Sequence, residues 1–253
     1  MITKQQLKLI QSLQHKKYRK LHGLFLVEGT KMVQELIRSD LSILHLIVTE
    51  PWQRDNPHFD FNGVLPEVLA EHSYKPLSKL TTPPGILAVA RIPEDNFKAL
   101  WLQEVVLCLD GISDPGNMGT IIRTAEWFGI RELICSQDCA DVWQPKTVQA
   151  SMGSVFRMQI HTTELSVFLK EVGTKHIPVY GALLEGSDVF QQVFSPESPA
   201  VLLIGSESHG INKSLLPLIT DPLTIPAHAL SKAESLNASV AAAIFLSCLR
   251  RKQ

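Results

Sequence analysis

The chain has 253 residues, of which 45% are hydrophobic and 19% are charged. This composition is typical of a globular protein and excludes a disordered or fibrous chain. The formal net charge of −1 excludes a uniformly cationic coat for nucleic acid. Any contact with a nucleic acid therefore depends on where the charges lie.

Positive charge is concentrated at the N-terminus. In the first 31 residues Glu28 is opposed by seven basic side chains, with two histidines nearby: Lys4, Lys8, Lys16, Lys17, Arg19, Lys20 and Lys31, with His15 and His22. A solvated helix face is the simplest interpretation of such a run. A phosphate-binding surface is the functional alternative.

The cysteines and the apolar segments of the chain indicate in which cellular compartment the protein is expected. Four cysteines, at positions 108, 135, 139 and 248, form no CxxC and no paired framework, which predicts a reduced, cytosolic compartment. Cys135 and Cys139 lack two further ligands at suitable spacing, so we predict buried thiols and no metal site. The N-terminus has no apolar segment of the kind found in secretory signals. The most apolar stretch, 236–249, is too short to span a bilayer, so a soluble protein is expected.

The first part of the chain predicts a small α/β layer structure. Apolar residues recur at helical spacing after Thr3, a candidate N-cap, and this indicates an N-terminal helix. Further elements are expected in the order strand, helix, strand, strand, at 25–29, 31–38, 44–49 and 85–92. The pattern loosens between Pro93 and Leu102, which indicates a linker.

The second part predicts an α/β domain with a parallel sheet. An apolar run of strand length at 105–112 is followed by a turn-rich loop at 113–119 and a helix at 120–129. Further strands are expected at 132–136, 178–184, 200–207 and 222–227, with a long last helix from about Ala233. Near-continuous apolar strands are typical of parallel sheets that are covered on both faces.

The loop and helix after the first of these strands, 110–130, make the first candidate site. Asn117 and Gly119 permit close approach of a backbone at a helix start. A nucleotide-phosphate cradle is an alternative, but the loop lacks the Lys-Ser/Thr pair of a P-loop and the glycine spacing of a dinucleotide fingerprint. Arg123 follows Asn117 by six positions, and we expect both to face one crevice. A phosphate-binding role for Arg123 competes with that of a solvated residue.

Two later segments also carry polar residues next to predicted elements. In the second segment, 201–212, the predicted strand runs into a polar turn that carries Gly205, Glu207 and Gly210. The spacing G-x-S-x-G is absent there, so a serine hydrolase is not expected. In the third segment, 223–251, Ser235 and Asn237 precede an alanine-rich helix, most of which is interpreted as a packed terminal helix.

Together, in this order, the three segments resemble the motifs of SpoU (TrmH-type) RNA methyltransferases of the SPOUT superfamily. N-x-G-x-x-x-R-T-A is found at 117–125, G-x-E-x-x-G at 205–210 and S-L-N-x-S-x-A at 235–241. The resemblance extends from about residue 105 to the end. Residues 17–37 are more loosely similar to the start of a substrate-binding domain related to ribosomal protein L30e.

The resemblance implies an architecture. It implies an L30e-like α/β domain at 1–95, a linker at 96–103 and a methyltransferase domain at 104–253 with a parallel sheet and a deep C-terminal trefoil knot. It also implies a homodimer. Knots are rare in proteins, so this expectation comes from the resemblance alone.

The implied activity is S-adenosylmethionine-dependent 2′-O-methylation of a ribose in RNA, in the cytoplasm. Ribosomal RNA is favoured because of the N-terminal domain, and transfer RNA is the alternative. A non-catalytic RNA-binding protein and a nucleotide-binding enzyme that uses the loop at 114–119 are the other hypotheses.

The resemblance also implies site residues. For catalysis these are Arg123, Asn117, Glu207, Ser235 and Asn237. Cofactor binding is expected at Ala182, Gly205, Ile225 and Leu236, with Ser235 and Asn237 close by. RNA binding is expected at Lys16, Lys17, Arg19, Lys20 and Arg123. A guanidinium is very hard to deprotonate, so positioning and electrostatic stabilisation are assigned to Arg123 before proton acceptance. No role is carried over to His209 or His228.

Overall fold

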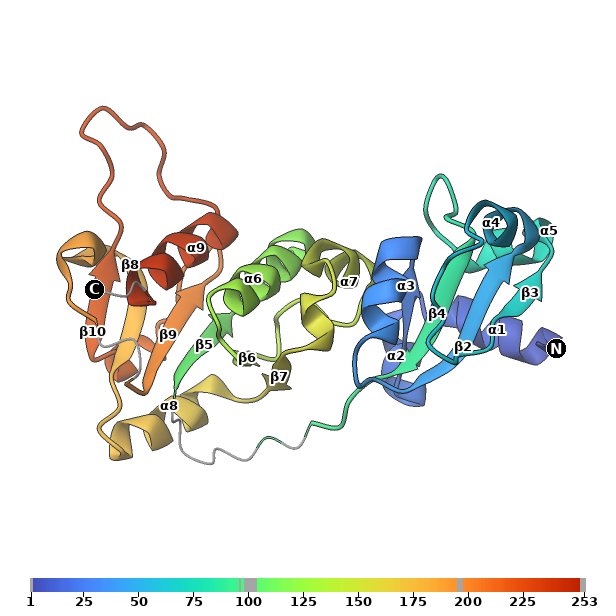
Figure 1. Cartoon of the computed structure of the whole chain (residues 1–253). Helices are drawn as coiled ribbons and strands as arrows, with labels where there is room; N and C mark the ends of the chain where they lie inside the picture. Colours follow the sequence, from blue (N-terminus) through green and yellow to red (C-terminus); the bar gives the residue numbers. More distant parts are fainter. Residues whose placement is uncertain (1, 96, 98–103, 195–197, 251–253) are drawn as a thin grey trace. The chain divides into compact units, whose positions relative to one another are not determined.

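The computed structural model describes residues 2–95, 97, 104–194 and 198–250, and its chain divides into two compact units (Figure 1). One consists of Met1–Glu94 with Asp141–Phe156, and the other of Asp95–Ala140 with Arg157–Gln253. The predicted linker at 96–103 lies outside the described residues, apart from Phe97. The domain limits 1–95 and 104–253 stay a prediction, because the compact units are not continuous in sequence.

The N-terminal unit contains a four-stranded sheet in the order β1-β4-β2-β3. Its strands are β1 (Leu24–Glu28), β2 (Ile43–Thr49), β3 (Glu67–Leu69) and β4 (Ile86–Arg91). Its first helices are α1 (Lys4–Ser12), α2 (Lys16–His22), α3 (Thr30–Ile37), α4 (Glu50–Asp55) and α5 (Glu71–Tyr74), followed by a 3-10 turn at Lys75–Leu77. Thr3 and Gln6 form a capping box at the start of α1, so the predicted N-terminal helix and its cap are confirmed.

A segment from the middle of the chain completes the core of this unit. Helix α7 (Pro145–Ser151) packs against β1. The rings of Phe25 and Trp143 lie 4.6 Å apart between centroids, and Phe25 also contacts Phe156 in the 3-10 turn at Ser154–Phe156. Such aromatic pairs combine a large buried apolar area with a specific geometry. The N-terminal unit therefore depends on residues that lie more than a hundred positions downstream.

A buried ion pair holds this segment to α2. Arg19 is 3% exposed, and its Nε and Nη2 donate to Oδ2 of Asp141 at 3.1 and 2.7 Å. Its Nη1 donates to the carbonyl oxygen of Leu13 at 2.8 Å. Charged groups can be buried in this way when paired and hydrogen-bonded. The positive charge of Arg19 is thus neutralised by Asp141 inside the N-terminal unit.

The C-terminal unit contains a six-stranded sheet in the order β10-β8-β9-β5-β6-β7, and all its strand pairs are parallel. The strands are β5 (Val105–Asp110), β6 (Glu132–Cys135), β7 (Gln159–Thr162), β8 (Val179–Asp188), β9 (Ala200–Gly205) and β10 (Asp221–Thr224). The α-helices are α6 (Pro115–Trp127), α8 (Leu165–Thr174) and α9 (Ala238–Leu249), with 3-10 turns at Val189–Gln191 and Leu216–Leu218. The predicted α/β class with a parallel sheet is confirmed.

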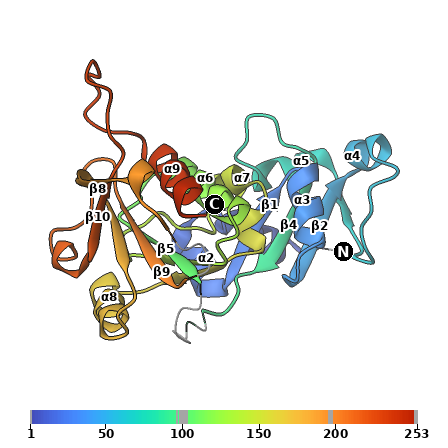
Figure 2. The ribbon, with the colours of Figure 1, turned by 60° about the vertical axis from the view of Figure 1, so that its left-hand side comes forward.

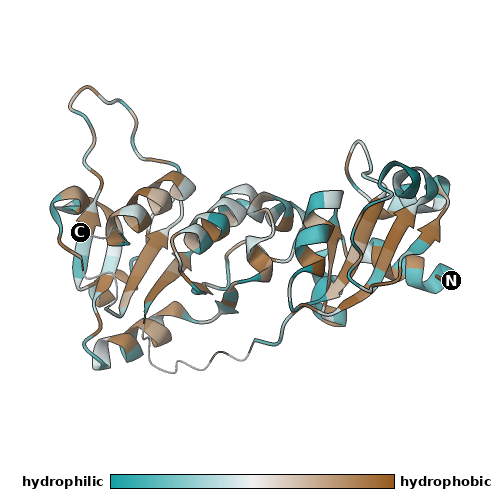
Figure 3. Cartoon of the chain, in the orientation of Figure 1, coloured by the Kyte–Doolittle hydropathy of each residue, from teal (hydrophilic) through white to brown (hydrophobic). Residues whose placement is uncertain are grey.

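The apolar strands form the core of this unit, as the colouring of Figure 3 shows. Every residue of β5 is buried. Phe168 and Leu169 of α8 belong to one buried cluster with Val201 and Leu203 of β9. Helices α6 and α9 pack against each other and lie side by side in both ribbon views (Figures 1 and 2). Burial on both faces explains why the central strands β5 and β9 show no alternation of apolar and polar residues.

Two helices begin at different residues from those predicted. Helix α6 begins at Pro115 rather than at residue 120, because the side chain of Asp114 accepts the N–H of Asn117 at 2.8 Å and caps the helix. Helix α9 begins at Ala238 rather than near Ala233, because Asn237 is its N-cap. The predicted loop at 113–119 is therefore wrong from Pro115 onward.

Other expectations have separate outcomes. Cys135 and Cys139 are buried, as predicted. Within the residues that the structure describes, no helix has both the length and the apolar composition needed to cross a membrane. The chain leaves β10, passes through residues 225–237 and returns to α9. The trefoil knot stays a prediction.

The ion pair gives a testable prediction. Asp141→Ala leaves the buried guanidinium of Arg19 without its carboxylate, and we expect the free energy of unfolding to fall by about 3 kcal/mol. Chemical denaturation measures this change. Asp55→Ala is the matched control, because the Arg54–Asp55 pair is exposed and spans 3.8 Å, and its loss costs about 0 to 1 kcal/mol. Equal effects of the two substitutions would contradict a structural role for the buried pair.

Candidate active site

The three motifs meet at one edge of the parallel sheet. Strand β5 lies next to β9 at the centre of the sheet, and the chain proceeds outward from β5 to β6 and β7 on one side. The neighbours β9, β8 and β10 occupy the other side. Such a reversal of strand order is the switch point where open α/β sheets bind ligands, beyond the carboxyl ends of the strands. The first motif follows β5, and the second follows β9.

The side chain of Asn117 joins all three motifs. Its Oδ1 accepts a hydrogen bond from Nδ2 of Asn237 at 3.0 Å, and its own Nδ2 donates to Oε1 of Glu207. A carboxylate only accepts hydrogen bonds, so Glu207 determines which end of the Asn117 amide faces it. We call Glu207, Asn117 and Asn237 the amide chain. The structure brings together these three predicted residues, which lie 90 and 120 positions apart along the chain.

Local structure orients each member of the amide chain. Helix α6 holds Asn117 in its first turn. Oδ1 of Asn237 accepts the backbone N–H and the hydroxyl of Ser239 at 2.9 and 2.6 Å, which leaves its Nδ2 for Asn117. Glu207 lies in a tight turn that two backbone hydrogen bonds between Ser206 and Gly210 close. The amide chain is therefore built from a helix start, an N-cap and a turn.

Position 205 requires a glycine because the backbone of Gly210 and Ile211 lies against it. A Cβ at this position would lie 2.1 Å from the backbone carbon of Gly210 and 2.3 Å from the nitrogen of Ile211. Neither neighbour can move without opening the turn that holds Glu207. The first glycine of G-x-E-x-x-G thus has a steric cause.

Arg123 lies outside the amide chain. Both it and Asn117 belong to α6, and six helical positions rotate a side chain by about 600°, which places the two about 120° apart around the helix axis. Arg123 is exposed, and its side chain has no hydrogen bond or ion pair with another described residue. The expected crevice shared by Asn117 and Arg123 stays a prediction. Arg123 is available to an anion from outside.

The expected cofactor positions lie on or directly after three adjacent strands, with Ala182 inside β8 (Val179–Asp188). Pairing of β8 with β9 ends at Gly181, immediately before Ala182. Gly205 ends β9, and Ile225 follows the end of β10. Because β10, β8 and β9 are neighbours and parallel, Gly205 and Ile225 lie at the carboxyl-end edge of the sheet, and Ala182 follows the last β8 residue that pairs with β9.

This edge offers both backbone groups and apolar side chains. The ladder between β8 and β10 skips residues 182–186, because the register shifts between Pro222 and Leu223, and in this stretch the carbonyl oxygen of Leu184 accepts the hydroxyl of Thr224 at 2.9 Å. Leu236 is 44% exposed, and Ser235 is also exposed. Backbone groups beside an exposed leucine suit a planar, uncharged ring with hydrogen-bonding edges. An adenine ring meets this description.

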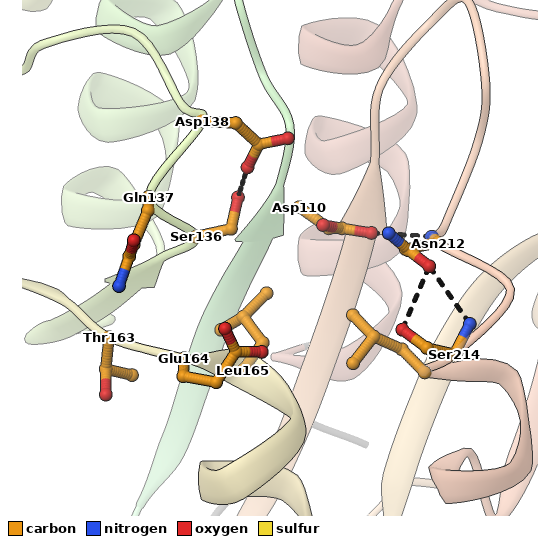
Figure 4. Close-up of a pocket in the computed structure, with 10 residues that line it drawn as sticks. Asp110, Ser136, Gln137, Asp138, Thr163, Glu164, Leu165, Asn212 and Ser214 are labelled. Atoms are coloured by element: carbon orange, nitrogen blue, oxygen red, sulfur yellow. Dashed lines mark hydrogen bonds between the residues drawn. The ribbon is translucent and has the colours of Figure 1, made fainter.

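A cavity of about 230 Å³ adjoins the ends of β5, β6 and β7 (Figure 4). Its lining includes three carboxylates, those of Asp110, Asp138 and Glu164. Burial raises the pKa of Asp110, opposed by the hydrogen bond that its Oδ2 accepts from the N–H of Asn212 at 2.6 Å. That bond ties β5 to the chain just after the Glu207 turn. Sequence reasoning missed Asp110, although it is the polar residue that ends the apolar run at 105–109.

The predicted RNA-binding residues of the N-terminal unit fall into two groups. Lys16, Lys17 and Lys20 are exposed on α2. Arg19 is buried and paired with Asp141, so a surface phosphate cannot reach it in this structure. We correct the prediction by leaving Arg19 out of the RNA-binding set.

In the described part of the chain no group of three or more His, Cys, Asp or Glu residues is arranged to hold a metal ion.

Comparison with known proteins gives two family matches. The model of the SpoU rRNA Methylase family matches residues 104–247, and the MRM3-like substrate binding domain matches residues 4–88. The chain is 31% identical over 246 residues to the 23S rRNA (guanosine(2553)-2′-O)-methyltransferase RlmP of Bacillus subtilis. The aligned region covers 97% of this chain and 96% of that protein.

Solved structures are similar over nearly the whole chain. A TrmH-family protein from Porphyromonas gingivalis has a TM-score of 0.86 and 38% identity, covering 99% of this chain and 98% of that one. The SpoU methyltransferase AviRb from Streptomyces viridochromogenes, solved with AdoMet, has a TM-score of 0.83 and 25% identity, covering 98% and 97%.

The double role of Asn237 gives a prediction. Asn237→Ala removes the N-cap of α9, and we expect a loss of about 1 kcal/mol in the free energy of unfolding. Asn237→Ser keeps a capping oxygen but is too short to reach Asn117, so its stability should stay close to that of the wild type. Thermal denaturation of both variants measures this. Equal losses would show that the bond to Asn117, rather than the cap, stabilises this region.

Proposed function

Because this chain belongs to the SpoU rRNA methylase family, we propose that it transfers the methyl group of S-adenosylmethionine to a ribose 2′-hydroxyl of RNA. The observation that carries this proposal is the amide chain, in which one side chain from each motif is hydrogen-bonded to the next. The names of RlmP and AviRb, two methyltransferases that match nearly the full chain, support it.

The cofactor would be held at the edge of β10, β8 and β9. Backbone groups at Ala182, Gly205 and Ile225 would bind the adenosine, and Leu236 would pack on it, with Ser235 and Asn237 beside them. When bound, S-adenosylmethionine supplies an electrophilic methyl group on a sulfonium. AviRb has been solved with this cofactor.

The chain's own residues have to align the attacking hydroxyl and stabilise its developing charge. The hydroxyl oxygen must lie about 3 Å from the methyl carbon, and a positioned donor lowers the barrier. Arg123 is exposed and has the multi-donor geometry to hold the adjacent phosphate and offer an N–H to the oxygen. The amide chain would hold the ribose. Glu207, an exposed carboxylate oriented by Asn117, is the candidate proton acceptor.

The substrate would be RNA rather than DNA, because the attacking group is a 2′-hydroxyl. We propose ribosomal RNA. RlmP is named as a 23S rRNA methyltransferase, and the match of residues 4–88 is to a substrate-binding domain. We place the reaction in the cytoplasm.

We also propose a homodimer formed through the C-terminal unit. Trp127 at the end of α6 is 84% exposed, and Val240 in the first turn of α9 is 47% exposed. Helices α6 and α9 pack together with their starts joined at Asn117 and Asn237 and their ends joined at Phe128 and Arg250, so these side chains lie at the two ends of one helix pair. Exposed apolar side chains on a helix pair are compatible with a protein interface along it. Light scattering at micromolar concentration should give twice the monomer mass, and a monomer would contradict the proposal.

Arg123 gives the sharpest prediction about the reaction. Arg123→Ala should reduce single-turnover methylation of 23S rRNA about 100- to 1000-fold, the usual cost of losing one oriented donor at a developing oxyanion. Arg123→Lys should recover little, because it keeps the charge and loses the planar fork. Cofactor affinity, measured by calorimetry, should stay nearly unchanged in both. Wild-type turnover by the Ala variant would refute the assignment, and loss of cofactor binding would move Arg123 to the cofactor site.

The exposed lysines of α2 give another prediction. Replacing Lys16, Lys17 and Lys20 by Ala should weaken RNA binding and flatten its dependence on salt, because fewer counterions are released. Fluorescence anisotropy over a range of salt concentrations measures both quantities. The same triple substitution at Lys75, Lys79 and Lys170 is the charge-matched control. Unchanged affinity and slope for the α2 variant would make the lysines a solvated face only.

A further inference from the structure

Helix α2 (Lys16–His22) buries one residue, and that residue is Arg19. The other six residues, Lys16, Lys17, Tyr18, Lys20, Leu21 and His22, are exposed. A surface helix ordinarily turns an apolar stripe to the core. Here Tyr18 and Leu21 are 37% and 67% exposed, and the ion pair with Asp141 holds the helix instead. The arrangement keeps an aromatic and cationic face in solvent.

The rings on this face are ordered relative to one another. Tyr18 and His22 lie one helical turn apart, and their ring planes are within 9° of parallel with centroids 6.4 Å apart. His15 meets Tyr18 edge-on at 6.5 Å. Nζ of Lys17 lies 6.0 Å from the centroid of the Tyr18 ring. Aromatic faces therefore alternate with ammonium groups along seven residues that contain no acidic side chain.

We propose that α2 is a stacking platform for an unpaired base of the RNA substrate. A base would lie on the ring of Tyr18, with His22 beside it, while Lys16, Lys17 and Lys20 contact the neighbouring phosphates. This inference rests on the proposed function, since it assumes an RNA substrate. It adds that the recognised RNA element contains a single-stranded loop or bulge.

Access to the base favours a single strand over a duplex. The bases of an A-form duplex are stacked on each other, and side chains cannot read its deep major groove. Lysines alone would bind duplex and single strand alike through phosphates. An exposed ring with cations on both sides suits a base that has left its helix. The three hydrogen bonds of Arg19 fix α2 before RNA arrives, which lowers the entropy lost on binding.

The test compares two RNA probes with full-length protein. One is a short single-stranded oligoadenylate that carries one 2-aminopurine, and the other is an RNA duplex of the same length. Tyr18→Ala should weaken binding of the single strand about 5- to 150-fold, as expected for the loss of one stacked base, without a change in salt slope. Duplex binding should stay unchanged. Quenching of 2-aminopurine should occur with the wild type and be lost in the variant.

Two variants serve as controls, and one parallel assay separates this inference from the proposed function. Tyr18→Phe keeps a ring and should bind like the wild type, and so should Leu21→Ala, which removes an exposed apolar side chain from the same helix. If Tyr18→Ala binds the single strand as tightly as the wild type, or loses both probes equally, the platform is refuted. Methylation of 23S rRNA by the wild type is measured alongside, because its absence would contradict the proposed function whatever the binding result.

Discussion

One amide side chain, that of Asn117, joins the three motifs on which the proposed site is built. Its oxygen accepts from Asn237 and its nitrogen donates to Glu207, so the start of α6, the cap of α9 and the turn after β9 are held in one arrangement. An aspartate could not donate to Glu207, and an alanine could do neither. The requirement for one donor and one acceptor on a short, planar side chain explains why asparagine occupies this position.

The parallel sheet makes this arrangement possible. All its strands point to the same edge, so segments separated by about a hundred residues meet there. Asp110 adds to this, because it ends β5 and binds the backbone of Asn212, just beyond the turn that holds Glu207. The N-terminal unit has a comparable long-range connection, in which Arg19 pairs with Asp141. Cutting the chain at the predicted linker would separate residues 141–156 from the core that they complete, exposing Trp143 and Phe156.

Many of these features could be predicted from the sequence, and the features that could not be predicted have identifiable physical reasons. The apolar runs at 105–112 and 200–207 predicted the buried parallel strands β5 and β9, and Thr3 predicted the start of α1, because burial and capping depend on residues that are close in sequence. The start of α6 was missed because the turn-forming residues Pro115 and Gly116 are also tolerated in a first helical turn. The burial of Arg19 could not be predicted, since its partner lies 122 positions away and a lysine-rich run ordinarily faces water. The residues of the amide chain were identified by resemblance. Their hydrogen bonds could not be predicted, because the partners lie 90 and 120 positions apart in the sequence.

Whether this chain methylates a ribose of ribosomal RNA is tested most directly by a map of 2′-O-methyl groups in total RNA. The RNA is taken from cells that make the protein, from cells that lack it, and from the latter after the gene is restored. We expect that one ribose in 23S rRNA loses its methyl group without the protein and regains it on restoration. An identical map in all three, or a change confined to transfer RNA, would contradict the proposed function.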